Sequence, residues 1–212
     1  MRKDTEKIRL IQPENTKTTK WSGGTTTQLA ICPEGAVYAD RDFIWRLSSA
    51  VVEDEESDFT PLPDYDRLIV MQGAPVELTH DGGPVIRLAP WQVHAFDGAA
   101  ATRSKGKGLD FNLMLRKGAA AGNLRVTEGK AGEVYAVETL AGGGQETDAP
   151  AEKTGSPVYA VYSSESALEI EAAGDVLQLK KGGLALIPDP AGEISVRPAQ
   201  DAHIITAVIR RR

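Results

Sequence analysis

The chain has little of several residue types on which particular functions depend. Cys32 is its one cysteine among 212 residues, which excludes an internal disulfide and a metal site built from cysteines. Its three histidines are His80, His94 and His203. None has a second histidine two residues away, so the paired spacing of a typical two-histidine metal centre is missing. We therefore expect no bound metal and no cofactor.

Long apolar runs and basic runs are also missing. No stretch approaches the ~18 apolar residues of a membrane span, and residues 1–20 carry charges throughout, without the apolar segment of a signal peptide. Lys and Arg number 24 against 30 Asp and Glu, and basic residues cluster only at residues 210–212. An acidic chain without a basic stripe is a poor partner for nucleic acid or an anionic membrane. The sequence predicts a cytoplasmic protein that binds neither.

The common catalytic motifs are absent as well. The sequence contains no G-x-S-x-G nucleophile motif, no Walker motif and no G-x-G-x-x-G phosphate cradle. Cys32 precedes Pro33 with no nearby base or cation in the sequence to stabilise a thiolate. Nothing in the sequence therefore predicts nucleophilic catalysis or nucleotide binding.

The sequence does contain many short strand patterns separated by turn residues. With 21 glycines and 12 prolines, no amphipathic pattern extends beyond about three helical turns. We predict strands at 9–12, 25–31, 43–52, 67–72, 76–80, 85–88, 92–96, 109–115, 124–127, 134–139, 158–162, 167–172, 176–179, 184–187, 194–197 and 204–209. Short strands at this close spacing indicate an all-β protein.

The two halves of the chain resemble each other. Residues 76–96 and residues 168–188 each read as a hairpin, a turn and a strand that ends in an aromatic residue or proline. This pattern resembles a cupin jelly roll. We therefore predict two cupin-like jelly-roll β-barrels, at residues 1–120 and 121–212, with a flexible loop at 141–157 where Gly, Ala, Pro, Glu and Thr dominate.

Polar residues share faces with apolar ones on two of the predicted strands. Arg46 and Ser48 alternate with Trp45 and Leu47, and Asp110 and Asn112 alternate with Phe111 and Leu113. If the polar faces point into a barrel, a buried guanidinium needs a carboxylate from the protein or from a ligand. An alternative for both strands stays open, in which the polar faces are exposed to solvent. For Arg67 the alternative is a structural role, in which it and the adjacent Asp66 are capping charges.

The polar and aromatic clusters together resemble the HutD/Ves family. The matching positions, in order along the chain, are Trp21, Gly23, Gly24 and Thr26; Trp45, Arg46, Ser48 and Ala50; Phe59, Tyr65, Asp66, Arg67 and Gly73; Phe96 and Gly98; and Asp110, Phe111, Asn112 and Met114. They cover residues 21–114 closely, whereas beyond residue 117 only the general cupin-like pattern remains.

The resemblance implies a metal-poor protein of two cupin barrels that is associated with histidine utilisation in bacteria. It implies no established enzymatic activity, and it suggests a sensor or governor that binds a pathway metabolite. A small carboxylate such as formylglutamate or urocanate suits the residues, with Arg46 forming a bidentate pair. The candidate ligand-binding residues are Thr26, Arg46, Ser48, Arg67, His94, Asp110 and Asn112.

Two other functions stay open. In the first, the protein is a metal-free hydrolase or isomerase in which Asp110 or His94 is the general base and Arg46 polarises the substrate. In the second, it is an interaction protein that associates with itself through sheet edges, as a homodimer would.

Overall fold

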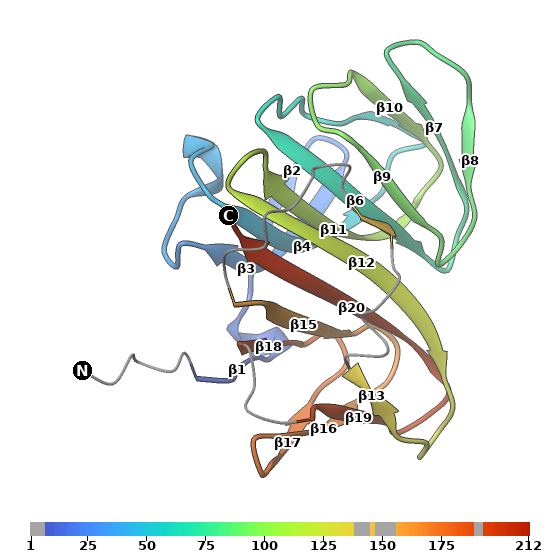
Figure 1. The fold of residues 1–212 in the computed structure, drawn as a ribbon. Coiled ribbons are helices and arrows are strands. Elements are labelled where there is room, and N and C mark those ends of the chain that lie inside the picture. The colour runs from blue at the N-terminus through green and yellow to red at the C-terminus, as the bar shows by residue number, and fades with distance from the viewer. Residues whose placement is uncertain (1–6, 138–144, 147–155, 189–192) are drawn as a thin grey trace. The chain divides into compact units, whose positions relative to one another are not determined.

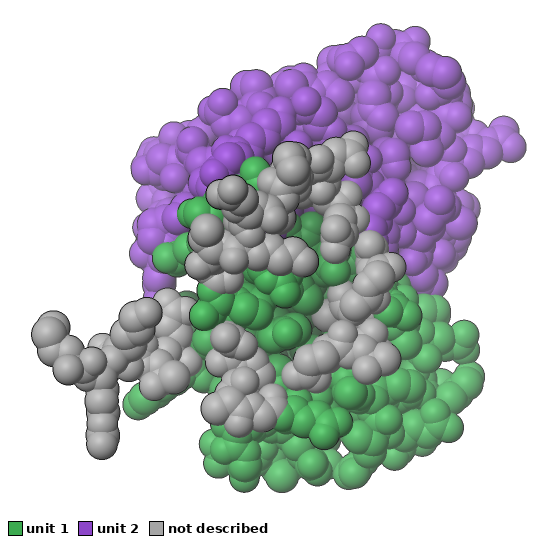
Figure 2. Space-filling view, in the orientation of Figure 1, with its two compact units in different colours: residues 1–15, 122–144, 152–212 green, residues 16–121, 145–151 purple. Residues whose placement is uncertain are grey.

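The computed structural model describes residues 7–137, 145–146, 156–188 and 193–212. Most of the loop predicted at 141–157 lies outside these residues. The described chain consists of β-strands and two short 3₁₀ helices, η1 (Pro13–Asn15) and η2 (Tyr38–Asp40). It divides into two compact units, coloured separately in Figure 2. Unit 1 holds residues 7–15, 122–137, 156–188 and 193–212, and unit 2 holds residues 16–121 and 145–146.

Unit 2 contains a six-stranded and a four-stranded antiparallel sheet (Figure 1). The larger sheet has the order β2 (Lys17–Trp21), β3 (Gly24–Cys32), β4 (Trp45–Val52), β11 (Gly108–Arg116), β6 (Tyr65–Gln72) and β9 (Val93–Asp97). The smaller sheet has the order β5 (Glu56–Asp58), β10 (Thr102–Lys105), β7 (Val76–His80) and β8 (Ile86–Leu88). The two-residue strand β14 (Gln145–Glu146) belongs to the same unit.

Unit 1 also contains two sheets. The larger includes, in order, β1 (Arg9–Ile11), β18 (Leu184–Pro188), β15 (Val158–Ser163), β20 (Ala202–Arg211) and β12 (Ala120–Gly129). The smaller has the order β13 (Tyr135–Ala136), β19 (Ser195–Pro198), β16 (Leu168–Ala172) and β17 (Asp175–Leu179). The core of this unit includes Val161, Ile170, Ile187 and Ile204, all fully buried.

Apolar side chains that alternate along the strands form the core of unit 2. Ile69 and Met71 on β6 pack with Leu78 on β7 and Leu88 on β8, so the two sheets bury a shared cluster. On β4 the six residues 45–50 are all buried, although alternate side chains point to opposite faces. Arg46 and Ser48 are therefore shielded from bulk solvent, and their face is not the exposed face of a sheet.

The all-β prediction is confirmed, but the predicted closure into barrels is not. The hydrogen-bonded order of the larger unit 2 sheet runs from β2 to β9 and does not return from β9 to β2. Closure requires pairing around the full circuit, and these sheets keep two edges instead. Four strands were not predicted, β2, β5, β10 and β14, the last of which lies within the predicted loop 141–157. Within the described chain, no helix has the length and apolar character needed to cross a membrane.

Candidate functional site

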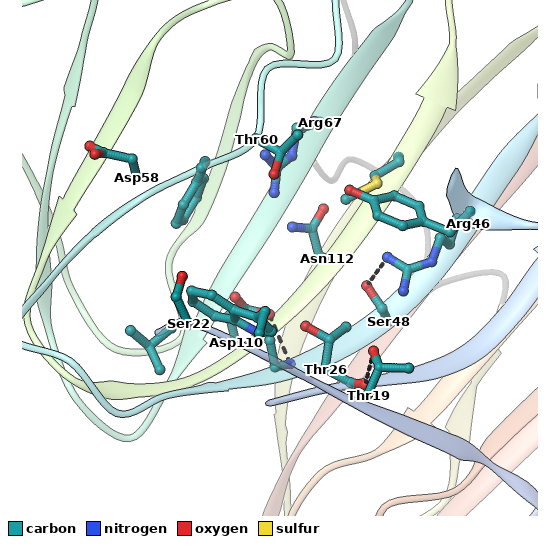
Figure 3. Close-up of a pocket in the computed structure, with 16 residues that line it drawn as sticks. Thr19, Ser22, Thr26, Arg46, Ser48, Asp58, Thr60, Arg67, Asp110 and Asn112 are labelled. Atoms are coloured by element: carbon teal, nitrogen blue, oxygen red, sulfur yellow. Dashed lines mark hydrogen bonds between the residues drawn. The ribbon is translucent and has the colours of Figure 1, made fainter. Parts of the chain in front are cut away.

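A cavity of about 300 Å³ lies within unit 2 (Figure 3). Strands β2, β3, β4, β6 and β11 line it, together with residues 58–60 and Tyr38 of η2. Six of the seven candidate residues are among its lining: Thr26, Arg46, Ser48, Arg67, Asp110 and Asn112. The structure thus brings together residues that lie as many as 86 positions apart in the sequence.

The strand register explains why these side chains meet. β11 pairs with β4 on one side and β6 on the other, which places Met114 opposite both Arg46 and Arg67. Two positions along β11, Asn112 lies opposite Ser48. Directly opposed residues in an antiparallel sheet point to the same face, so these rows project together into the cavity.

Arg46 is buried but has only neutral hydrogen-bond partners. Its side chain donates from Nε to Oε1 of Gln28 (3.0 Å) and from Nη1 to Oγ of Ser48 (3.1 Å). Its Cζ lies 4.3 Å from the centre of the Tyr38 ring, a cation–π contact. Burial lowers the pKa of Arg46 below its usual value, and the charge of Arg41 adds to this effect. Within the described chain, no carboxylate forms an ion pair with Arg46.

Arg67 is the second buried guanidinium of the cavity, with 6% of the residue exposed. Its Cζ lies 4.9 Å from the ring centre of Phe59 and 5.1 Å from that of Phe96. Its Nε is buried and has no hydrogen-bond partner among the described residues. Burial lowers the pKa of Arg67 to about 10, so the side chain is still a cation at neutral pH. Arg67 is therefore a buried cation that lines the cavity.

Asp110 supplies the carboxyl group of the cavity. The backbone N–H of Ala50 donates to its Oδ1 at 3.1 Å. Burial raises the pKa of Asp110 to about 6, although the neighbouring Arg67 opposes this shift. The carboxyl group of Asp110 is therefore about half ionised near pH 6. Even when fully ionised, its one negative charge balances only one of the two positive charges of Arg46 and Arg67.

Asn112 and Ser48 provide neutral polar groups between the charged ones. Asn112 is 4% exposed, and its Oδ1 has no hydrogen-bond partner within the described chain. The Ser48 hydroxyl already accepts from Arg46, and the Thr26 hydroxyl lies at the side of the cavity formed by β3. A cavity with two guanidinium groups and several neutral donors is suited to hold a small anion.

His94 is not part of the cavity lining, and His80 is half-buried rather than exposed beside the turn that follows it. Nε2 of His80 and Nε2 of His94 lie 2.9 Å apart, and Nδ1 of His80 lies 2.8 Å from Oγ1 of Thr102. His80 is instead held between strands, because it faces β10 across the smaller sheet. The described residues include no group of three or more His, Cys, Asp or Glu side chains placed to hold a metal ion.

Sequence reasoning missed several cavity residues. Tyr38 comes from η2, and its ring covers Arg46, but no periodic pattern in a short 3₁₀ segment predicts such a contact. Phe59 is one of the positions that carry the family resemblance, and this signal could have assigned it to the site. Gln28 does not line the cavity, but it holds Nε of Arg46 from the neighbouring strand.

Comparison with known structures first defines the class of protein. A cupin 2 conserved barrel domain protein from Leptotrichia buccalis superposes with a TM-score of 0.51 at 12% identity, over 96% of each chain. The chain therefore has the cupin fold. The HutD family model matches residues 13–204, which is most of the sequence, and the chain belongs to the HutD family.

Two solved structures resemble the whole chain. A conserved protein of unknown function from Pseudomonas aeruginosa PAO1, PA5104, has a TM-score of 0.77 at 20% identity and covers 96% of this chain and 99% of its own. HutD from Pseudomonas fluorescens SBW25, in a formate condition, has a TM-score of 0.69 at 21% identity and covers 97% and 100%. At these identities the likeness shows the fold. No curated protein matches the sequence significantly.

Proposed function

We propose that this protein binds a small carboxylate metabolite in the unit 2 cavity and acts as a regulator linked to histidine utilisation. The family membership motivates the pathway, and formylglutamate and urocanate are the ligands that suit it. The proposal includes the finer organisation predicted from the sequence, in which each unit is a cupin-like jelly roll, and a cytoplasmic location. A carboxylate ligand is the part that the side chains themselves support.

The observation that carries the proposal is a pair of buried guanidiniums, Arg46 and Arg67, that face one cavity and have no carboxylate in ion-pair contact among the residues that the structure describes. Burying a cation is costly unless an anion or several hydrogen bonds compensate it. Arg46 has two neutral acceptors, and Nε of Arg67 has none among the described residues. A ligand carboxylate would supply the missing negative charge through charge-assisted hydrogen bonds.

Isothermal titration calorimetry with formate, formylglutamate and urocanate tests this proposal. Formate is the first probe because it is the smallest carboxylate and because the Pseudomonas fluorescens HutD structure is described for a formate condition. We expect wild type to bind at least one of the three, and Arg46→Ala to bind it ~10- to 100-fold more weakly, the usual cost of losing hydrogen bonds to a charged group.

The matched control is Arg87→Ala. Arg87 is an arginine of the same unit, its side chain is 85% exposed, and it pairs with Glu77 instead of lining the cavity. This variant should bind like wild type. Equal heats for wild type and a folded Arg46→Ala protein would contradict the proposed role of Arg46, and the absence of heat with all three compounds would contradict carboxylate binding.

A second function, metal-free acid–base catalysis, is favoured by one observation. A carboxyl group with a pKa of about 6 beside two cations can accept or donate a proton near neutral pH. Asp110 is therefore the general base in this alternative, and His94, which lies outside the cavity lining, is not. Mass spectrometry of each bound compound distinguishes the two, since a binding protein returns its ligand unchanged and an enzyme does not.

A further inference from the structure

The His80–His94 pair joins the two sheets of unit 2 outside the cavity lining. His80 lies on β7 of the smaller sheet and His94 on β9 at the edge of the larger one. Their rings are nearly parallel, with centroids 5.2 Å apart, and their Nε2 atoms are 2.9 Å apart. Two facing ring nitrogens at this distance share one proton, so at least one of them must be unprotonated.

The hydrogen bonds around the pair determine where its protons lie. The Thr102 hydroxyl donates to the carbonyl of Ala100, so its oxygen accepts from Nδ1–H of His80. Neutral His80 then has its lone pair on Nε2, and it accepts from Nε2–H of His94. A first added proton can enter at Nδ1 of His94 without breaking this bond. A second would place two N–H groups against each other and break the pair.

Aromatic contacts connect this pair to the cavity. The Phe96 ring stacks on His80, with centroids 4.8 Å apart, and on His94, with centroids 5.6 Å apart. The same ring lies 5.1 Å from Cζ of Arg67, and Phe96 and Arg67 are directly opposed across β6 and β9. The histidine pair and a cation that lines the cavity therefore contact the same aromatic side chain.

We propose that His80 and His94 form a proton-binding site coupled to the cavity through Arg67, so that an anion binding at Arg67 is accompanied by proton uptake at the pair. The inference rests on the proposed function, because it concerns the regulation of the same cavity. Linkage is reciprocal, and a site that takes up a proton when the anion binds also binds the anion more tightly as pH falls. The pair thus makes anion affinity sensitive to acid.

The charges near the pair determine the sign of the coupling. Burial lowers the pKa of both histidines, and the charge of Arg67 adds to the lowering for His80, whereas Asp81 opposes it. The charge of His80 also lowers the pKa of His94. Among the other charged side chains on these and the neighbouring strands, Arg103 pairs with Glu56, Arg87 with Glu77 and Asp97 with Lys117, all at exposed positions. Lys105 on β10 is exposed, and Asp66 on β6 is half-buried. An anion on Arg67 offsets its positive charge and therefore favours the protonated pair.

Proton NMR of the histidine ring signals tests the coupling directly, because the chain has three histidines. The signals are assigned with His80→Gln, His94→Gln and His203→Gln, and wild type is titrated with acid in the absence and presence of saturating formate. We expect formate to raise the midpoints of His80 and His94 by about 0.3 to 0.6 pH unit, as charges ~10 Å apart do in a high-dielectric setting. His203 belongs to neither the pair nor the cavity lining, and its signal serves as the internal reference.

Arg67 variants test the same coupling without an anion. Arg67→Gln removes the positive charge and should raise the His80 midpoint, whereas Arg67→Lys keeps the charge and should leave it near the wild-type value. Formate binding by calorimetry with unmoved His80 and His94 midpoints would overturn this inference and leave the proposed function standing. No formate binding at any pH overturns formate as a ligand of the cavity and the inference with it. If Arg67→Gln does not fold, the formate titration of wild type decides alone.

Discussion

Asp110 is a buried residue whose ionisation should affect the stability of the fold between pH 4 and pH 7. Its pKa is about 6 in the folded protein against an ordinary value of 3.8, so the folded state holds the proton more tightly than the unfolded state. Above pH 6 the folded protein contains a buried carboxylate, which lowers the free energy of unfolding. As pH falls from 6 towards 3.8 the folded state takes up a proton at Asp110, and the free energy of unfolding increases.

Asp110→Asn should stabilise the protein at pH 8, because asparagine resembles the neutral acid and its oxygen can still accept from Ala50 N–H. The difference between a pKa of about 6 and one of 3.8 corresponds to ~3 kcal/mol, so we expect the free energy of unfolding to increase by about 1 to 3 kcal/mol at pH 8 and by nothing near pH 4. Thermal unfolding at the two pH values measures it, with the exposed Asp175→Asn as control. A lower melting temperature at pH 8 would mean that the two guanidiniums need the carboxylate charge.

The residue pattern predicted part of this site. Alternation on residues 43–52 and 109–115 placed Arg46 with Ser48 and Asp110 with Asn112 on common faces, and the structure brings all four to the cavity. Alternation cannot decide which face is buried, since that depends on the second sheet. The contact between His80 and His94 was not predictable for the same reason, because it joins strands of different sheets.

At the scale of elements, the sequence predicted strands wherever apolar residues alternate. It missed β2 because all five of its residues are exposed, and β5 because its residues are polar. On β10 the buried positions are Thr102 and Ser104, so burial alternates but hydrophobicity does not. A strand that is fully exposed, or that buries threonine and serine instead of apolar residues, therefore lacks the alternation of apolar and polar residues on which the prediction relies.

The turn between β2 and β3 is an element on which the cavity depends. Trp21 and Ser22 line the cavity, and Gly24 follows them with a φ of +152°. A Cβ at Gly24 would lie 1.9 Å from the carbonyl oxygen of Val51 on β4, which no side chain tolerates. Only glycine allows β3 to approach β4 this closely at the turn.

Gly24→Ala should therefore displace the turn, destabilise the protein by about 2 kcal/mol or more and weaken formate binding. Chemical unfolding and calorimetry measure the two effects. Gly82→Ala is the matched control, because Gly82 also has a positive φ, +68°, but its Cβ would meet no atom within 4 Å. Gly82→Ala should lower the free energy of unfolding by only about 1 kcal/mol and should bind formate with wild-type affinity. Equal effects of the two variants would contradict the close approach at Gly24.

At the scale of the whole molecule, the first strand, β1, pairs with a strand near the other end of the sequence. The sequence placed residues 9–11 in the first of two domains, whereas in the structure they pair with β18 at residues 184–186. Leu10 packs against the unit 1 core, and Gln12 exchanges hydrogen bonds with Gln178 and Lys180. No local pattern could predict this, because the partners are more than 160 residues apart. The division into two domains at residue 120 stays a prediction.

Removal of residues 1–12 should destabilise unit 1 without affecting the cavity. The deletion exposes the edge of β18 and the apolar surface beneath Leu10, and we expect a loss of ~2 to 4 kcal/mol, visible as a lower melting temperature. Formate affinity should stay at the wild-type value, since the cavity is lined by residues 19–114. An unchanged melting temperature would contradict the contribution of β1.

The central claim is that a ligand carboxylate occupies the cavity between the two buried guanidiniums. A crystal structure of the protein with the tightest of the three carboxylates tests it most directly. The account predicts carboxylate oxygens within hydrogen-bond distance of Arg46 or Arg67 and beside Asn112. A ligand bound elsewhere while this cavity holds only water, or Asp110 turned to pair with both arginines, would contradict it.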